Sequence, residues 1–480
     1  MKRNRVIGFC LAGAMGVSLL GCSGNETAGG TAASAGTEAS AETAGEVKPS
    51  EEADSSSGTG EVTEIRFTEW DGGETLALYE EIAEKFNAEH PDIHVTVMNI
   101  PSSEYDTKIT AMIAGNDTPE ICYMESGTIL YPLAEEGVIL NLQEYIDNDP
   151  EFDKDCLMEE LTYRMSDDFV VAYGAGAENM CMFYNPSLFE EYGVEEPPAS
   201  YEDAWDWDTF VKNAQLLTID SEGRNALDPA FDPENIEIYG VNLSQWWGGY
   251  MPFMYSVGCD YLNEDGTSIG YATEEGIEVF QRLQDLIYKY HVAPTPTVSS
   301  SMPGLSEILA TNKVAMSFSG QWDNATLMED EVVYNVAAFP KMGEEAKTII
   351  TCAGISLMNT EKADAAWEFM KYLFTEVGAN EPLYKSALWL PNNKKEYNDE
   401  YMKSCITDKH PSNYYETCVK PMLDGTAEPP VTARVKNFSK INDIITPALD
   451  QLWSGEKTAR EVLEGVKEAA DAQVQGYYAE

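Results

Sequence analysis

Positive charge is scarce in this chain, which has 30 Lys and Arg residues against 83 Asp and Glu residues and a formal net charge of -53. Proteins bind nucleic acids mainly by neutralising phosphates with Lys and Arg, so this composition excludes a nucleic-acid partner. Arginine is also the side chain that most often binds carboxylate and phosphate groups, through paired hydrogen bonds, and only six arginines follow residue 21. A neutral ligand therefore suits the chain better than an anionic one.

Patterns of metal ligands are missing as well. The four histidines (His90, His94, His291 and His410) are dispersed, and no two cysteines stand at the C-x-x-C spacing of zinc and iron–sulfur sites. The acidic stretch 147–153 is similar to a calcium loop, but Phe152 stands at its sixth position, where such a loop needs glycine. We expect no metal and no cofactor, and calcium at this stretch stays open.

A disulfide framework is not expected from the nine cysteines. One lies in the apolar stretch at the amino terminus and one is Cys22, which leaves an odd, widely scattered set of seven. Three of these (Cys122, Cys181 and Cys352) stand in apolar runs and are expected to be buried as small hydrophobic side chains. A pair between Cys405 and Cys418 is left open.

The chain has one long apolar run, at its amino terminus. Three basic residues stand within the first five positions and precede the run Val6 to Leu20, which is shorter than the ~20 residues of a membrane-spanning helix and fits a signal peptide. It ends in Leu19-Leu20-Gly21-Cys22, which resembles the bacterial lipobox. We expect a signal peptide over 1–21 and a diacylglyceryl group on the Cys22 thiol, with an ordinary secretory signal as the alternative.

Residues 22–60 contain almost no bulky apolar side chain. Such a segment cannot bury enough surface to offset its ordering entropy, so it is expected to be a flexible tether with a span of roughly 35 Å. The residues that follow are too many for one hydrophobic core, which favours two lobes. The expected location is the outer face of the cell membrane, lipid-anchored, in a Gram-positive bacterium.

The body of the chain opens with alternating strand and helix patterns. Period-two alternation predicts strands over 62–67 and 93–97, helical stripes cover 76–86 and 105–114, and a short apolar run over 121–124 predicts a third strand. This order predicts a parallel sheet with right-handed crossovers in an α/β fold. Ligands of such sheets lie beyond the carboxyl ends of the strands, where Trp70 and Glu125-Ser126 fall.

Several motifs resemble family 1 of the extracellular solute-binding proteins of ABC sugar importers, which includes maltose-binding-type proteins. They keep the family's order and spacing from about Val62 to the carboxyl terminus. These motifs are Phe67-Thr-Glu-Trp-Asp-Gly-Gly, Phe86-Asn-Ala-Glu-His-Pro-Asp-Ile, Thr107-Lys-Ile-Thr-Ala-Met-Ile-Ala-Gly-Asn-Asp-Thr-Pro-Glu-Ile, Met182-Phe-Tyr-Asn-Pro-Ser-Leu-Phe, Lys313-Val-Ala-Met-Ser-Phe-Ser-Gly-Gln-Trp, Cys352-Ala-Gly-Ile-Ser and Ala365-Ala-Trp-Glu-Phe-Met-Lys-Tyr-Leu.

The resemblance implies a two-lobed periplasmic-binding-protein-like fold of type II that closes on its ligand by a hinge. Three crossings would join the lobes, near 172–179, 351–356 and 388–391. Lobe one would comprise 61–175 and 354–388, and lobe two 176–353 and 389–480. The function implied is capture of a neutral mono- or oligosaccharide by a monomer that delivers it to the permease subunits of an ABC transporter.

A sugar binder needs aromatic platforms for C–H faces and planar polar groups for hydroxyls. Trp322 matches a family position that stacks on sugar, and the other expected platforms are Trp70, Trp246, Trp247 and Trp389. The expected polar groups are Glu69, Asp71, Glu125, Ser126, Glu178, Asn179, Asn242, Gln321 and Asp323, with Gly354 for close backbone approach. The family usually has a proline and an aromatic residue where this chain has Ala175-Gly176-Ala177-Glu178, so no particular sugar is transferred.

Two other functions stay open beside import. One is a lipid-anchored sugar sensor that reports to a membrane kinase, whose binding site would look the same. The other is a lipid-anchored glycoside hydrolase, which needs two carboxylates that flank the scissile bond. No local pattern singles out such a pair among the 83 acidic residues, so we expect a protein that is not an enzyme.

Overall fold

The computed structural model describes residues 62–124 and 129–478. The predicted signal peptide, Cys22, the predicted tether, Glu125 and Ser126 lie outside these ranges. Within the described residues no helix combines the length and apolar character that a membrane crossing needs.

The first sheet follows the expected strand–helix order. From edge to edge it contains β2 (Ile93–Asn99), β1 (Thr63–Glu69), β3 (Ile121–Met124), β12 (Gly354–Leu357), β5 (Phe169–Gly174) and β4 (Thr162–Ser166). β1 pairs in parallel with β2 and β3, while β12, β5 and β4 are antiparallel to their neighbours. The parallel α/β start is confirmed, and β1 continues two residues beyond the expected strand, to Glu69.

The second sheet is built from later segments of the chain. Its order is β13 (Ala427–Glu428), β11 (Thr348–Thr351), β6 (Glu178–Tyr184), β9 (Val314–Gly320), β8 (Ile236–Asn242) and β7 (Ile219–Asp220), and β10 (Asn335–Ala337) also pairs with β6. β8 and β9 are parallel, whereas β6 is antiparallel to β9, β10 and β11. The two sheets give the two-lobed α/β fold that the sequence predicted.

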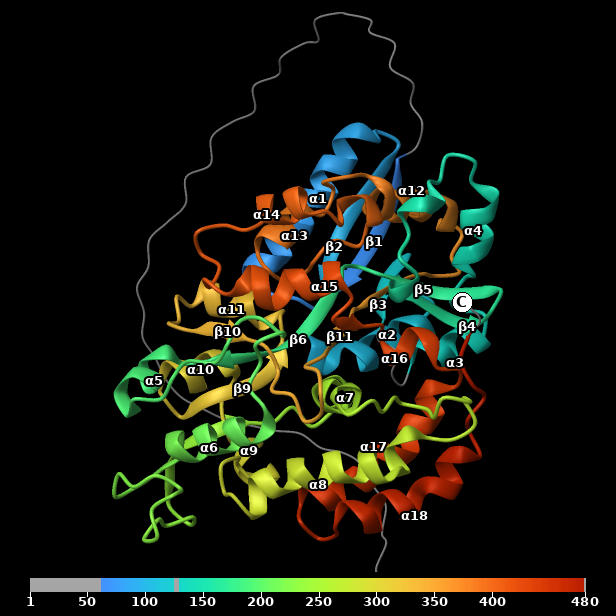
Figure 1. The fold of residues 1–480 in the computed structure, drawn as a ribbon. Helices are drawn as coiled ribbons and strands as arrows, with labels where there is room; N and C mark the ends of the chain where they lie inside the picture. Colours follow the sequence, from blue (N-terminus) through green and yellow to red (C-terminus); the bar gives the residue numbers. More distant parts are fainter. Residues whose placement is uncertain (1–61, 125–128, 479–480) are drawn as a thin grey trace, which may run out of the picture. The chain divides into compact units, whose positions relative to one another are not determined.

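Helices pack on both sheets (Figure 1). Those between the strands of the first sheet, or packed on it, are α1 (Gly73–Glu89), α2 (Tyr105–Ala114), α3 (Leu130–Glu135), α4 (Leu142–Asn148), α12 (Ala363–Thr375) and α13 (Glu381–Lys385). The others are α5 (Pro186–Tyr192), α6 (Trp207–Leu217), α7 (Trp247–Ser256), α8 (Glu274–Tyr288), α9 (Pro296–Ser299), α10 (Leu305–Ala310), α11 (Asp323–Glu329), α14 (Asp399–Ser404), α15 (Lys420–Asp424), α16 (Val431–Arg434), α17 (Phe438–Trp453) and α18 (Ala459–Asp471). Among these, α8, α17 and α18 lie side by side.

Each sheet has its own hydrophobic core. Phe67 packs against Phe369 of α12 beneath the first sheet, and Phe253 of α7 packs against Phe318 beneath the second. Trp322 is half-buried and packs against both cores. The side chain expected to be a sugar platform therefore stands where the two halves of the protein meet.

The chain changes sheet at the expected crossings. It leaves the first sheet after β5 and enters the second at β6, and it returns between β11 and β12. At the third crossing, Leu390 exchanges two backbone hydrogen bonds with Ala177. The amide of Asn392 donates to the carbonyl groups of Gly174 and Ala175, so chain predicted to belong to lobe two is also bonded to lobe one. The lobe boundaries stay a prediction.

The seven cysteines in the described ranges are free thiols. Cys122 and Cys181 are fully buried, as the apolar runs around them predicted, whereas Cys352 is only partly buried. Cys405 and Cys418 are both unpaired, and Cys418 contacts Cys181 instead.

Candidate ligand-binding site

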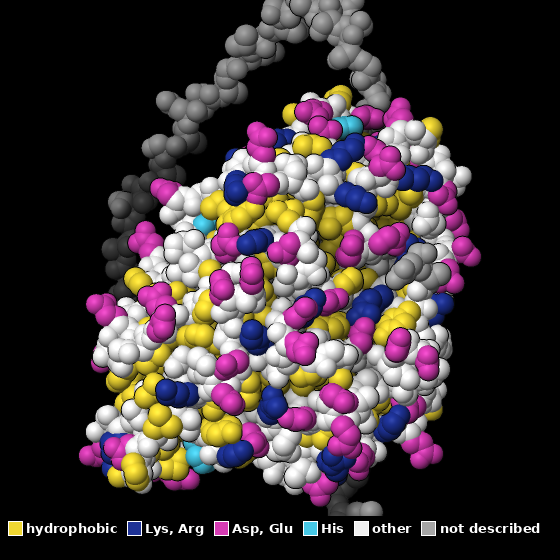
Figure 2. Space-filling view, in the orientation of Figure 1, with side chains coloured by type: hydrophobic (Ala, Val, Ile, Leu, Met, Phe, Trp, Pro, Cys, Tyr) yellow, Lys and Arg dark blue, Asp and Glu magenta, His cyan; other side chains and the backbone are white. Residues whose placement is uncertain are grey.

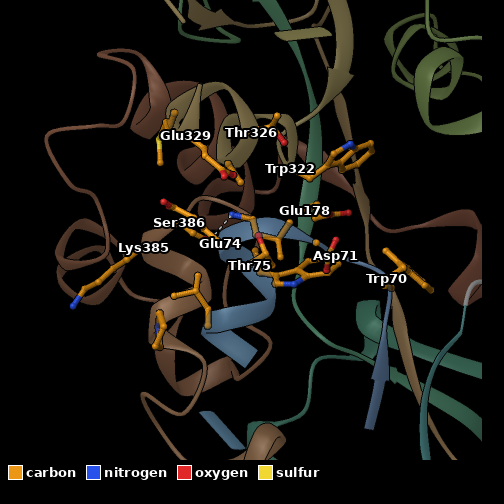
Figure 3. A pocket seen from close by; sticks show the side chains of 18 of the residues that line it. Trp70, Asp71, Glu74, Thr75, Glu178, Trp322, Thr326, Glu329, Lys385 and Ser386 are labelled. Carbon is orange, nitrogen blue, oxygen red and sulfur yellow. Dashed lines mark hydrogen bonds between the residues drawn. The ribbon is translucent and has the colours of Figure 1, made fainter. Parts of the chain in front are cut away.

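A cavity of about 900 Å³ is lined by segments of both sheets and by the crossings between them (Figure 3). Its aromatic lining consists of Trp70, Tyr163, Trp246, Trp247, Trp322 and Trp389. These residues come from the end of β1, from β4, from the start of α7, from the link between β9 and α11, and from the third crossing. Every predicted tryptophan platform therefore lines this one cavity.

The second sheet contributes three of the tryptophans as a group. The ring centroids of Trp246 and Trp247 are 4.7 Å apart in an edge-to-face arrangement, and that of Trp246 is 6.3 Å from that of Trp322. The Trp322 ring lies against Gly320 at the end of β9. A Cβ atom on Gly320 would lie 1.8 Å from this ring. Glycine at position 320 therefore makes room for the indole.

The first sheet presents Trp70 on an aromatic support. Its ring meets Tyr105 of α2 edge-to-face at 5.2 Å and Tyr123 of β3 at 4.9 Å. Such pairs contribute about 0.5–1.5 kcal/mol beyond the buried area. Because Tyr105 and Tyr123 are buried, they hold the Trp70 ring at the carboxyl end of β1.

The polar lining comes from three helices, from the crossings and from the stretch 407–409. Its members are Asp71, Glu74 and Thr75 at the start of α1, Glu178 and Thr351 at the crossings, Thr326 and Glu329 on α11, Lys385 and Ser386 at the end of α13, and Thr407, Asp408 and Lys409. The Thr351 hydroxyl donates to the Glu178 carboxylate at 3.2 Å. These groups place hydroxyl-binding carboxylates beside the tryptophan rings.

Two carboxyls stand at and just after the end of β1, that of Glu69 fully buried and that of Asp71 half-buried. Burial raises the pKa of Asp71 to about 7. Burial likewise raises the pKa of Glu69 to about 7, where the hydrogen bond from Asn99 opposes the shift and the charge of Asp71 adds to it. One oxygen of each carboxyl, Oδ2 of Asp71 and Oε2 of Glu69, is buried and has no partner. Asp71 is also in the cavity lining.

Several predicted polar residues do not line the cavity. Glu69 is fully buried, and its carboxyl accepts a hydrogen bond from the Asn99 amide. The Asn179 amide donates to the carbonyl of Cys418. Side chains alternate along a strand, so Glu178 faces the cavity and its neighbour Asn179 faces away. Gln321 is fully buried, and neither polar atom of its amide has a partner.

The other predicted residues lie elsewhere. Gly354 is buried between β3 and β5, where its smallness lets the strands pair. Asn242 and Asp323 line a neighbouring cavity of about 250 Å³. Burial raises the pKa of Asp323 to about 6, and the hydrogen bond from Ser319 opposes this shift.

Some of the cavity-lining residues that were not predicted could have been found from their spacing along two helices. Glu74, Thr75 and Leu78 follow helical spacing on α1, which begins two residues after Asp71, and Ala325, Thr326 and Glu329 do so on α11, which begins directly after Trp322. Residues three or four apart share a helix face, so these side chains could be inferred from the helix starts beside the predicted Asp71 and Trp322. Tyr163, Lys385 and the stretch 407–409 carry no such signal, because only the tertiary fold brings them to the cavity.

The protein surface does not suggest a polyanion partner. On the face drawn in Figure 2, acidic side chains are spread between Lys and Arg side chains, and no basic patch gathers there. In the part of the chain that the structure describes, no arginine lines the main cavity. The geometry thus defines a two-lobed binding protein whose central cavity is rich in tryptophan and carboxylate.

Comparison with known proteins identifies the family. The family model for bacterial extracellular solute-binding proteins matches residues 71–380. The chain belongs to this family, whose members work outside the cytoplasm with ABC importers. The predicted resemblance is therefore confirmed.

The individual relatives and solved structures share 19–23% of their residues with this chain. The chain is 23% identical to a binding protein of Brucella abortus over 87% of this chain and 94% of that one, and 22% identical to the maltotriose-binding protein of Pyrococcus abyssi over 68% and 66%. Among solved structures, the ABC substrate-binding protein Lmo0181 of Listeria monocytogenes in complex with cycloalternan has a TM-score of 0.71 and 22% identity over 86% of this chain and 99% of that one. The GacH receptor of Streptomyces glaucescens has a TM-score of 0.66 and 19% identity over 87% and 99%.

Proposed function

We propose that this protein captures a neutral oligosaccharide in the cavity between its two sheets and delivers it to the permease of an ABC importer. The observation that carries the proposal is the lining, which brings six aromatic side chains together with carboxylates and hydroxyls. Aromatic faces pack on the C–H faces of sugar rings, and carboxylates accept hydrogen bonds from ring hydroxyls.

The size of the cavity supports an oligosaccharide over a monosaccharide. Its volume of about 900 Å³ lies near the upper end of ligand pockets. Relatives of the same fold are known in complex with cycloalternan, with acarbose and with maltotriose. These likenesses support a sugar of several rings without choosing among them.

The charges of the lining support a neutral ligand. Among the described residues, the cationic side chains in it are Lys385 and Lys409, and Lys385 points away from Trp70 and Trp322 in Figure 3. An anionic sugar would meet the carboxylates of Glu74 and Glu178 without an arginine side chain to balance their charge.

We also propose that the protein is a monomer held at the surface of a Gram-positive cell by a lipid on Cys22. The support is the lipobox-like Leu19-Leu20-Gly21-Cys22 and the polar segment after it. Replacement Cys22→Ala is expected to move the protein from the membrane fraction into the medium and to abolish incorporation of labelled fatty acid. Membrane retention of the variant would contradict the anchor.

A thermal-shift panel tests the ligand class. Maltose, maltotriose, cycloalternan, glucosamine, spermidine, glycerol phosphate and amino acids are added to the purified protein at rising concentration. Binding to the native state alone stabilises it by RT ln(1 + [L]/Kd), about 2.7 kcal/mol at a hundredfold excess over Kd. We expect a neutral oligosaccharide to give the largest shift. A shift with spermidine or glycerol phosphate alone would refute a sugar receptor.

Two further assays separate the roles left open by the sequence. A sugar that binds and is recovered intact after prolonged incubation contradicts a glycoside hydrolase. Stimulation of ATP hydrolysis by the reconstituted importer in the presence of the loaded protein supports import. If the loaded protein changes only the activity of a membrane kinase, the sensor function replaces import.

A further inference from the structure

Trp389 is held on two sides by residues that do not touch the cavity. Its indole nitrogen donates to the hydroxyl of Tyr79 on α1 at 2.8 Å, and Trp389, Tyr79 and Tyr123 are all buried. The Tyr79 hydroxyl is also hydrogen-bonded to that of Tyr123 on β3. A buried indole N–H that loses its acceptor keeps the full cost of desolvation, so this contact restricts the plane of the ring.

The other side of Trp389 rests on the first crossing. A Cβ atom on Gly176 would lie 2.5 Å from the Cβ of Trp389 and 2.6 Å from its Cγ. The next residue along, Leu390, is bonded to Ala177 through both its N–H and its carbonyl group. The Trp389 side chain thus occupies the space that a side chain at position 176 would fill.

The same hydroxyl pair reaches the second platform. Tyr123 meets Trp70 edge-to-face at 4.9 Å, so a continuous series of contacts runs from Trp389 through Tyr79 and Tyr123 to Trp70. It joins a ring from the third crossing to a ring at the end of β1. α1, which carries Tyr79, also places Glu74 and Thr75 in the cavity.

We propose that Tyr79 is a positioning residue whose hydroxyl sets the plane that Trp389 presents to the ligand, and couples it to Trp70 through Tyr123. This inference rests on the proposed function, since it assumes that the cavity binds a sugar. Tyr79 acts on the ligand only through the tryptophans and does not line the cavity. It therefore tunes affinity and sugar preference without a contact of its own.

The first experiment needs no ligand. Full-length protein labelled with 5-fluorotryptophan is compared by ¹⁹F NMR with its Tyr79→Phe variant, and the Trp389 signal is assigned by its absence from Trp389→Phe. We expect the Trp389 signal to shift and broaden in Tyr79→Phe, with a smaller shift at Trp70. An unchanged Trp389 signal overturns the proposal, whatever the cavity binds.

The second experiment is a double-mutant cycle with maltotriose as the probe, measured by calorimetry. Tyr79→Phe is expected to weaken binding on the order of tenfold, as for loss of one buried hydrogen bond, and to weaken it much less in a Trp389→Phe background, where only the contacts through Tyr123 to Trp70 remain. Equal weakening in both backgrounds means that Tyr79 does not act through Trp389 and overturns the proposal. If wild-type protein binds no sugar at all, the proposed function falls while the ¹⁹F result stands on its own.

Tyr184→Phe is the matched control. Tyr184 is a buried tyrosine of β6 whose hydroxyl donates to Glu196 at 2.7 Å, outside the cavity lining. Its loss of a hydroxyl is expected to leave both the Trp389 signal and the Kd for maltotriose unchanged. The melting temperature of each ligand-free variant reports any loss of stability separately from the loss of binding.

Discussion

Replacement Gly320→Ala should move the Trp322 indole without altering any group that could contact a ligand. The new Cβ would lie 1.8 Å from Cζ3 of Trp322 and 2.1 Å from both Cε3 and Cη2. Carbon atoms pack at about 3.5–4.0 Å, so the ring has to move by roughly 2 Å. Since the strand end at Gly320 has no positive φ angle, the backbone accepts alanine and the ring must yield.

The expected consequence is a loss of stacking on the ligand. A displaced aromatic anchor weakens binding by on the order of 1–3 kcal/mol, which is about fivefold to 150-fold in Kd. Calorimetry with the sugar that gives the largest thermal shift measures this loss, and near-ultraviolet circular dichroism reports the movement of the indole.

Gly304→Ala is the control for Gly320→Ala, because a Cβ at position 304 meets no atom within 4 Å. It should leave the Kd unchanged. If Gly320→Ala folds, moves the indole and still binds with wild-type affinity, Trp322 is not a platform for the ligand. The assignment of the cavity as a stacking site would then lose its central residue.

Three other expectations concern stability, measured by urea unfolding of the ligand-free protein. The pKa of Asp71 is raised to about 7, so its native carboxyl keeps a proton that the unfolded chain releases near pH 4. The contribution of Asp71 to the free energy of unfolding is therefore full below about pH 4 and is lost as the pH rises through about 7. Asp71→Asn should make the fall in stability between these pH values less steep, and an unchanged slope would contradict this. Thr458→Ala removes the capping box with Glu461 at the start of α18 and should cost about 1 kcal/mol; an equal midpoint would refute this. The carboxylate oxygens of Asp260 accept hydrogen bonds from Arg434 at 2.6 and 2.7 Å. Replacement Arg434→Met leaves this carboxylate without its partner and should lower the free energy of unfolding by about 1–3 kcal/mol. Adding Asp260→Leu should restore part of that loss, and no recovery in the double variant would count against the pairing.

Local pattern in the sequence was enough to predict the elements that open the first sheet. The alternation in 62–67 and 93–97 and the stripe through 76–86 depend only on neighbours along the chain, and they became β1, β2 and α1. The same holds for composition, because the scarcity of arginine and the abundance of tryptophan already pointed to a neutral ligand with flat apolar faces.

The second sheet and its crossings depended on the family resemblance. Periodicity does not reveal that β12, near residue 355, pairs with β3 and β5 of the amino-terminal part. Such pairs join residues far apart in sequence, and no local propensity encodes them. Resemblance to proteins of the same fold supplied the order of segments, and the structure supplied their register.

The sequence by itself determined which residue types the site would use, and the tertiary structure decided which of them face the cavity. Glu178 and Asn179 were equal candidates until the pleat of β6 turned one toward the cavity and the other toward Cys418. Tyr163 and Tyr79 gained roles only because β4 and α1 pack against the crossings. The physical reason is that alternation within a strand is local, whereas the choice of the face that meets a ligand depends on packing between distant segments.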